Sequence, residues 1–230
     1  MANGCSCTRG EELIDPGRDA WPAVLSRRMG VEHVNLARDG SSNRRIVRST
    51  VARLQTVLHE QGAEPADVLV IIAWTQVSRH EYFSEIEAPE RRSGPGDGPV
   101  DRHWQRIGPW RRDAGHRPSK AFYKYLWDPN GQLINFFTDW ILLDSFLQQV
   151  GVTARYAHTF PLVESLHSEP STLAGYLNPE SIWGGIPPVL GHSFLEMPSK
   201  MPRGPGGHPL CDGHQWFAGR LEEWLRGRGM

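Results

Sequence analysis

The chain has 230 residues, 39% of them hydrophobic, which suits one sizeable α/β domain or at most two small ones and excludes a wholly disordered chain. Its formal net charge of -1 gives no reason to expect nucleic acid or an anionic membrane surface as a partner, and the basic pairs Arg44-Arg45 and Arg111-Arg112 are expected on solvated faces. The three cysteines, Cys5, Cys7 and Cys211, are odd in number, which argues against a disulfide framework.

Hydrophobic periodicity and turn residues divide the first third of the chain into alternating helices and strands. In chain order they predict a small-residue turn at 1–10, a helix at 19–30, a short strand at 33–36, a polar loop at 37–43, a helix from Ser42 or Asn43 to His59, and a strand at 67–74. The last of these, DVLVIIAW, is apolar throughout, as expected of a central parallel strand that is covered on both faces.

The rest of the chain contains longer irregular stretches. It predicts a loop insertion or lid at 88–118, a long helix at 119–149 broken at 128–131, a strand at 154–160, loops with short helices at 161–207, and a final helix at 215–226. The most apolar stretch, 133–150, contains Asn135, Asp139 and Asp144, so it predicts a buried helix and not a membrane span. Without a signal peptide in the sequence, we expect a cytoplasmic location.

The order of these elements predicts the fold class. Strands that alternate with helices indicate a parallel sheet with helices on both faces. We therefore expect a single domain over residues 1–230, folded as a three-layer α/β/α sandwich with a parallel sheet of about five strands.

Two segments far apart in the sequence carry residues that could take part in a reaction. Asn3 to Gly10 reads NGCSCTRG and places Ser6 among small residues in the first turn, where ligands bind in open α/β sheets. Gly207 to Ala218 reads GHPLCDGHQWFA and places His208, restricted by the proline after it, before the last amphipathic helix.

The spacing of these motifs resembles that of the SGNH (GDSL-like) hydrolases over the whole chain. Four segments carry the resemblance in the family's order: Gly4-x-Ser6-x-Thr8-x-Gly10 with Trp21-Pro22, Val34–Ala37 with Gly40–Asn43, Val70–Gln76, and His208-Pro209 with Gly213-His214 and Ala218. They look closest to a divergent branch whose first block begins GCSxT. The resemblance implies a flavodoxin-like sheet and a serine esterase or acyl hydrolase that forms an acyl-enzyme and needs no cofactor.

By that resemblance, Ser6 is the nucleophile and His208 is the base that takes its proton. The backbone N–H groups of Ser6 and Gly40 would stabilise the oxyanion, and Asn43, Thr75 or Gln76 would supply the third donor, since the family's usual third-block Asn is absent. The family's acidic residue, two or three positions before the histidine, is also missing, because Pro205 and Gly206 stand there. A backbone carbonyl or Asp212 would orient the imidazole instead.

Three other interpretations stay open at this point. His208, Cys211 and His214 have spacing compatible with a metal site, although no second ligand pair accompanies them, so no metal is expected. Cys5 or Cys7 could act as the nucleophile, although an alternating backbone would point both away from the side chain of Ser6. The missing acid and Asn would also suit a catalytically impaired ligand-binding protein.

The resemblance also defines the expected partners. The substrate would be a small-molecule ester or another acylated compound, and neither a nucleic acid nor a membrane is expected. An acyltransferase would use the same acyl-enzyme and exclude water, with residues 88–118 as the covering segment. The sequence gives no information on the oligomeric state.

Overall fold

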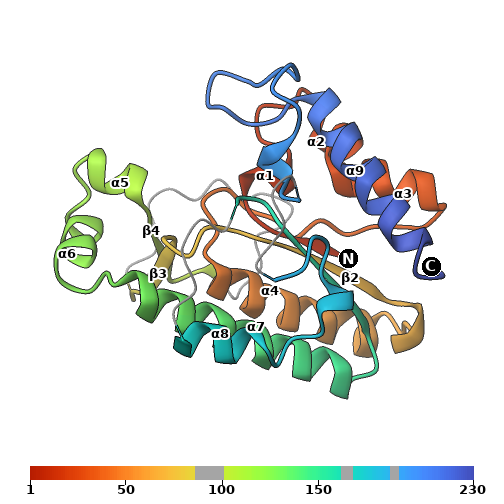
Figure 1. The fold of residues 1–230 in the computed structure, drawn as a ribbon, viewed down its shortest axis with the longest axis horizontal. Helices are drawn as coiled ribbons and strands as arrows, with labels where there is room; N and C mark the ends of the chain where they lie inside the picture. Colours follow the sequence, from red (N-terminus) through yellow and green to blue (C-terminus); the bar gives the residue numbers. More distant parts are fainter. Residues whose placement is uncertain (86–100, 162–167, 187–191) are drawn as a thin grey trace.

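The computed structural model describes residues 1–85, 101–161, 168–186 and 192–230 (Figure 1). The chain has an α/β fold built on a parallel sheet with the strand order β1-β2-β5. The bounds of the strands are β1 Ala2–Asn3, β2 Leu69–Trp74 and β5 Thr153–His158. The central strand β2 pairs along its whole length with β5, so the carboxyl ends of all three strands meet at one edge.

Helices cover both faces of this sheet because β2 is apolar on both sides. Val70, Ile72 and Trp74 contact one core, whereas Ile71 and Ala73 contact the other. The first core also contains α4 (Asn43–Gln55) and α7 (Pro129–Gln149), and the second contains α3 (Trp21–Met29) and α9 (Cys211–Arg226). Figure 1 shows α3 and α9 side by side on one flank of the sheet and α4 and α7 on the other.

Shorter elements complete the described part of the chain. The short helices are α1 Ser6–Arg9, α2 Pro16–Asp19, α5 Pro109–Asp113, α6 Arg117–Tyr125 and α8 Ser168–Ala174. A π-helical turn, Thr56–Glu60, extends α4, and 3-10 turns lie at Pro65–Asp67, Pro179–Ser181 and Phe194–Glu196. An antiparallel hairpin of β3 (His80–Phe83) and β4 (Trp104–Ile107) forms a second sheet.

The helix predicted at 119–149 is broken at the expected place. Asp128 lies between α6 and α7, and its side chain accepts the Gly131 N–H at 2.7 Å as an N-cap, with Pro129 as the first helical residue. One face of α7 is buried in the core and the other is exposed, and its buried Asp144 accepts the Tyr156 hydroxyl at 2.8 Å. In the described ranges, no helix is long and apolar enough to cross a membrane.

The outer strands of the sheet are shorter than expected. The strand predicted at 33–36 is reduced to one parallel bridge, between Ala2 and Asn35. On the far side of β5, single parallel bridges join Tyr156 to Ile182 and His158 to Ser193. The parallel sheet that the structure describes therefore has three strands, and a count of about five is not confirmed.

Two expectations about the segment around the hairpin are wrong. Residues 101–118, expected as part of a loop or lid, contain β4, α5 and the start of α6, whereas 88–100 lie outside the described residues. Arg45, expected on a solvated face, is 2% exposed and its Nη2 lies 2.7 Å from Asp101 Oδ2. This buried ion pair accounts for the burial of Arg45, because it ties the segment that enters β4 onto α4.

Two buried histidines make the folded state sensitive to acid. His158 ends β5 and is 3% exposed, and His214 lies in α9 with no exposure. Burial lowers the pKa of each imidazole to about 4. The unfolded chain takes up these protons from about pH 6.5, and the folded chain does so only near pH 4, so the free energy of unfolding falls as the pH drops through this window.

Replacing His158 by Phe is expected to remove part of this acid sensitivity. The phenyl ring is planar like the imidazole, slightly larger, and has no titrating group, so the loss of unfolding free energy between pH 7 and pH 5 becomes smaller by about 2 kcal/mol. Urea titrations at the two pH values measure it. His59→Gln, at an exposed position, keeps the wild-type difference, and a wild-type difference in His158→Phe would contradict the assignment.

Candidate active site

The turn after β1 is built so that Ser6 stands at the carboxyl edge of the sheet. A Cβ at Gly4 would lie 2.2 Å from Thr8 Oγ1 and 3.1 Å from the Ala73 carbonyl oxygen, so only glycine fits between them. Ser6 begins α1, and Gly10 ends it in a left-handed conformation with φ of 88°. The backbone is thus helical from Ser6, and not alternating as expected from the sequence.

The structure brings Ser6 and His208 together across 202 residues of sequence. The Ser6 Oγ lies 3.0 Å from His208 Nε2. His208 precedes α9, in a tight turn closed by a 2.9 Å hydrogen bond from the Gly204 N–H to the His208 carbonyl. Ser6 is 7% exposed and the His208 side chain 23%, so the pair is shielded but reachable from solvent.

A third group, Glu12, completes the arrangement on the other side of the imidazole. Its Oε2 lies 2.8 Å from His208 Nδ1 and also accepts the His208 N–H at 3.1 Å, while Oε1 accepts the Gly206 N–H at 2.7 Å. The Gly206 N–H, followed by the bonds from His208, lowers the pKa of Glu12 below its usual range. Glu12 is therefore an ionised carboxylate at neutral pH.

The charge of Glu12 determines how the imidazole is protonated. An ionised carboxylate only accepts hydrogen bonds, so Nδ1 of His208 carries a proton and donates a hydrogen bond to Glu12. In the neutral imidazole the other nitrogen, Nε2, is then an acceptor that faces the Ser6 hydroxyl. This is the protonation pattern that a general base for Ser6 requires.

Glu12 is the residue that the sequence motifs did not identify, and Asp212 does not take the role expected of it. Asp212 is exposed on the first turn of α9 and forms no hydrogen bond with His208, both being described residues. The acid comes instead from the segment after α1, where Glu12 has a φ of 68°, which is rare for a residue other than glycine. The signal was available in two adjacent acids, Glu11 and Glu12, directly after the serine motif.

The glycines before His208 make room for this carboxylate. A Cβ at Gly204 would lie 2.6 Å from Glu12 Cδ, and one at Gly206 would lie 3.1 Å from Oε2. Gly206 stands at one of the positions where the resemblance places an acid. Because Gly206 has no side chain, the space beside His208 is open to the carboxylate of Glu12.

Gly204→Ala is therefore expected to damage the site although it replaces none of the three side chains Ser6, His208 and Glu12. The added methyl group would displace the Glu12 carboxylate, and a misplacement of about 1 Å in such a site can reduce turnover by about 10²-fold. Ester turnover and thermal unfolding, measured together, test this. Gly207→Ala is the matched comparison, because nothing lies within 4 Å of a Cβ there and its φ of 82° adds backbone strain alone. Full turnover in Gly204→Ala would show that this contact does not position Glu12.

The loop that carries Gly40 lies beside the Ser6 turn. Asn35 Nδ2 donates to the Thr8 carbonyl at 2.9 Å, Arg38 N–H donates to the Gly4 carbonyl at 3.4 Å, and Arg9 forms an ion pair with Asp39. Gly40 turns the chain with a φ of 63°. The Gly40 N–H is thus held on the same edge of the sheet as the N–H of Ser6. Ser6 is the first residue of α1, and the first N–H groups of a helix have no partner within the helix.

The three candidates for the further oxyanion donor differ in their surroundings. The Asn43 amide is bonded to Thr75 in both directions: Oδ1 accepts the Thr75 N–H at 2.9 Å and Nδ2 donates to the Thr75 carbonyl at 3.1 Å. One Nδ2 proton of Asn43 has no part in this pairing. Thr75 Oγ1 is buried without a partner among the described atoms, and Gln76 is exposed. Asn43 is therefore the most rigidly held of the three.

The residues named in the metal and cysteine interpretations lie in separate surroundings. His214 Nδ1 accepts the Trp21 N–H at 3.0 Å, while Cys211 is exposed. Across the described ranges, no three His, Cys, Asp or Glu side chains are grouped so that they could hold a metal ion. Cys5 and Cys7 are buried in the core between α3, α9 and the sheet, at 0% and 2% exposure.

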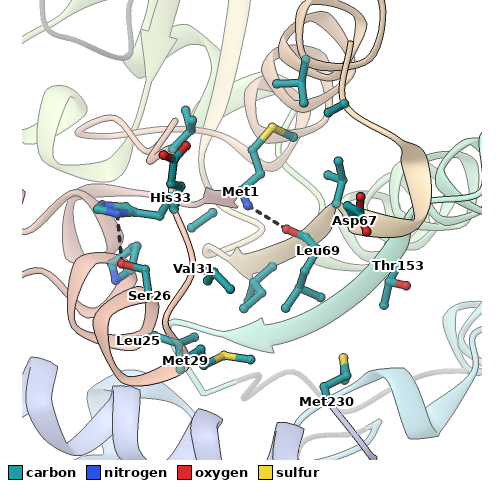
Figure 2. Close-up of a pocket in the computed structure, with 18 of the residues that line it drawn as sticks. Met1, Leu25, Ser26, Met29, Val31, His33, Asp67, Leu69, Thr153 and Met230 are labelled. Carbon is teal, nitrogen blue, oxygen red and sulfur yellow. Dashed lines mark hydrogen bonds between the residues drawn. The ribbon is translucent and has the colours of Figure 1, made fainter. Parts of the chain in front are cut away.

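A separate pocket of about 600 Å³ lies at the opposite edge of the sheet (Figure 2). Met1, Leu69 and Thr153, at the amino ends of the strands, line it, together with apolar residues of α3. Figure 2 also shows Ser26 beside His33, with Ser26 Oγ 3.1 Å from His33 Nδ1. Ser26 donates its proton to the Ala23 carbonyl at 3.0 Å, so this second serine–histidine pair braces the end of α3.

The site has the geometry of a serine-hydrolase triad, because a hydroxyl, an imidazole and a carboxylate are hydrogen-bonded in a row. It lies in an α/β fold, at the carboxyl edge of the parallel sheet. By sequence, the chain belongs to a family of unknown function, DUF6071, which matches residues 12–177. The matched range includes Glu12 and the Gly40 loop, while Ser6 and His208 lie outside it. No curated protein matches the chain.

Proposed function

We propose that this protein is a serine esterase or acyl hydrolase that acts through Ser6, His208 and Glu12. The observation that carries the proposal is the unbroken hydrogen-bond sequence from Ser6 Oγ to His208 Nε2 and from His208 Nδ1 to Glu12, at 3.0 and 2.8 Å. A serine hydroxyl becomes a useful nucleophile only beside such a base. Glu12 also supplies the acid whose apparent absence suggested an impaired, ligand-binding protein.

The proposed reaction has two halves. Ser6 Oγ attacks the ester carbonyl carbon as its proton passes to His208 Nε2, and the negative charge on the carbonyl oxygen is stabilised by the N–H groups of Ser6 and Gly40, with Asn43 as the side-chain donor. The bond to the alcohol then breaks, and the proton on Nε2 passes to the departing oxygen. Water then attacks the carbonyl carbon of the seryl ester as one of its protons passes to His208 Nε2, the bond from that carbon to Ser6 Oγ breaks, the proton returns from Nε2 to Oγ, and the carboxylic acid is released.

The finer fold assignment is part of the same proposal. Single parallel bridges at Asn35, Ile182 and Ser193 extend the sheet on both sides of the order β1-β2-β5. We interpret these as shortened edge strands of a five-stranded, SGNH-like α/β/α sandwich. The proposed substrate is a small ester, and the cytoplasmic location stays a prediction.

A panel of esters with acyl chains of two to eight carbons tests the proposed function. The wild-type protein is expected to release the alcohol from at least the short-chain members, and to show a burst when deacylation is the slower half. Adding a primary alcohol as acceptor distinguishes hydrolysis from acyl transfer, since a transferase would form the new ester in preference to the free acid. Failure to turn over any ester, with or without the acceptor, would contradict the proposal.

A further inference from the structure

Arg79, in the loop after β2, is held between two aromatic rings. Its guanidinium carbon lies 5.2 Å from the ring centre of Trp110 in α5 and 4.9 Å from that of Phe160, which follows β5. Cation–π contacts of this kind attract the guanidinium and fix its direction. No motif in the sequence points to Arg79.

Arg79 and its two aromatic contacts lie next to the proposed oxyanion donors. A Cβ at Gly40 would lie 3.0 Å from Trp110 Cζ2, so the ring that carries Arg79 packs directly on the Gly40 turn. Arg79 also lines a pocket of about 170 Å³ together with Asn43. The guanidinium thus lies beside the Gly40 turn and Asn43, which carry two of the proposed oxyanion donors.

Arg79 has the donors of an anion-binding residue, and two of them are unused by the rest of the described chain. Its Nε and Nη1 are buried and have no hydrogen-bond partner among the described residues. Arg45 and Arg48 differ, because both pair with Asp101, whereas Arg53 and Arg155 each leave only Nε buried without a partner among the described residues. Leaving buried charged donors unpaired is costly, and the two ring contacts offset only part of that cost. An arginine fork presents its donors in the geometry that carboxylates and phosphates accept.

We infer that Arg79 determines substrate specificity by binding an anionic group, such as a carboxylate, carried by the ester that reacts at Ser6. The inference rests on the proposed function and names its substrate class: esters with a negatively charged substituent on the acyl or the alcohol side. Arg79 would hold that substituent while Ser6 attacks the carbonyl carbon.

Two matched pairs of esters test this substrate class. Monomethyl succinate and its neutral counterpart methyl 4-oxopentanoate place the charge on the acyl side, and acetoxyacetate and acetoxyacetamide place it on the alcohol side. The wild type is expected to favour the anionic member of one pair in kcat/KM by about 10–100-fold, as estimated for hydrogen bonds to a charged group. Arg79→Met should abolish that ratio mainly through KM, and Arg79→Lys should keep part of it.

Two further measurements separate this inference from the proposed function. Arg220→Met removes the same charge from an exposed position on α9 and should keep the wild-type ratio. Calorimetric binding of succinate and of glycolate needs no turnover, and Arg79→Met should weaken the binding of one of them by about 10–100-fold. Ester turnover without any anionic preference in either pair would overturn the role of Arg79 and leave the proposed function standing. If no ester reacts, equal binding of both acids by wild type and Arg79→Met would overturn it as well.

Discussion

Ser6→Ala is expected to lower kcat for ester hydrolysis by about 10⁴–10⁶-fold, the loss seen when a triad nucleophile is removed. Without Oγ no acyl-enzyme can form, and only the oxyanion donors and binding remain to assist attack by water. Because the serine is 7% exposed and its side chain is small, the fold should tolerate the change. Steady-state turnover of a short-chain ester, with the unfolding temperature measured alongside, checks both statements.

Ser26→Ala is the matched control for this experiment. Ser26 also lies beside a histidine, His33, but at the opposite edge of the sheet and with its proton donated to a helix carbonyl. We expect this variant to keep wild-type turnover. Equal activity in Ser6→Ala and the wild type would remove Ser6 from the reaction.

Glu12→Gln is expected to lower kcat by about 10⁴-fold, the loss seen when a triad acid is removed. The amide has nearly the same shape but can present its NH₂ to His208, which would favour the proton on Nε2 and turn the base away from Ser6. It also removes the negative charge that stabilises the imidazolium formed during attack. The lowered pKa of Glu12 implies that its ionised form persists below the usual acidic range of a carboxyl group.

Glu11→Gln provides the neighbouring control, because Glu11 pairs with Arg9 at 3.2 Å and makes no hydrogen bond with His208, both being described residues. We expect it to retain turnover within about 3-fold, as is usual for a surface substitution. If Glu12→Gln behaves like Glu11→Gln, the carboxylate is a structural clamp on the turn at 204–208 and not part of the reaction.

Much of the fold could be predicted from the sequence because the strongest patterns are local. The apolar run of β2, the helix at α4 and the Asp128-Pro129 break before α7 each follow from neighbouring residues. The sheet edges could not be predicted, since a single bridge such as Ala2 to Asn35 leaves no alternating pattern. The structure inside 101–118 depends on contacts with α4, which composition does not reveal.

The candidate site was only partly predictable for a similar reason. Ser6 and His208 can be identified from the sequence only when their two segments are taken together as motifs of one resemblance, and the structure brings them together. Glu12 reaches His208 only because the chain turns through a positive φ at that residue and because Gly204 and Gly206 leave space for its carboxylate. Arg79 depends on rings from two other segments. Such partners are set by tertiary packing, which no spacing rule within one segment encodes.

Labelling with a fluorophosphonate probe reports whether Ser6 is an activated nucleophile, because only a serine activated by a neighbouring base reacts readily with it. We expect peptide mass spectrometry of the wild-type protein to find the phosphonyl group on Ser6, Ser6→Ala to stay unlabelled, and Ser26→Ala to be labelled at the wild-type rate. Wild-type protein that stays unlabelled, or that carries the group on a residue other than Ser6, would contradict the proposed role of Ser6.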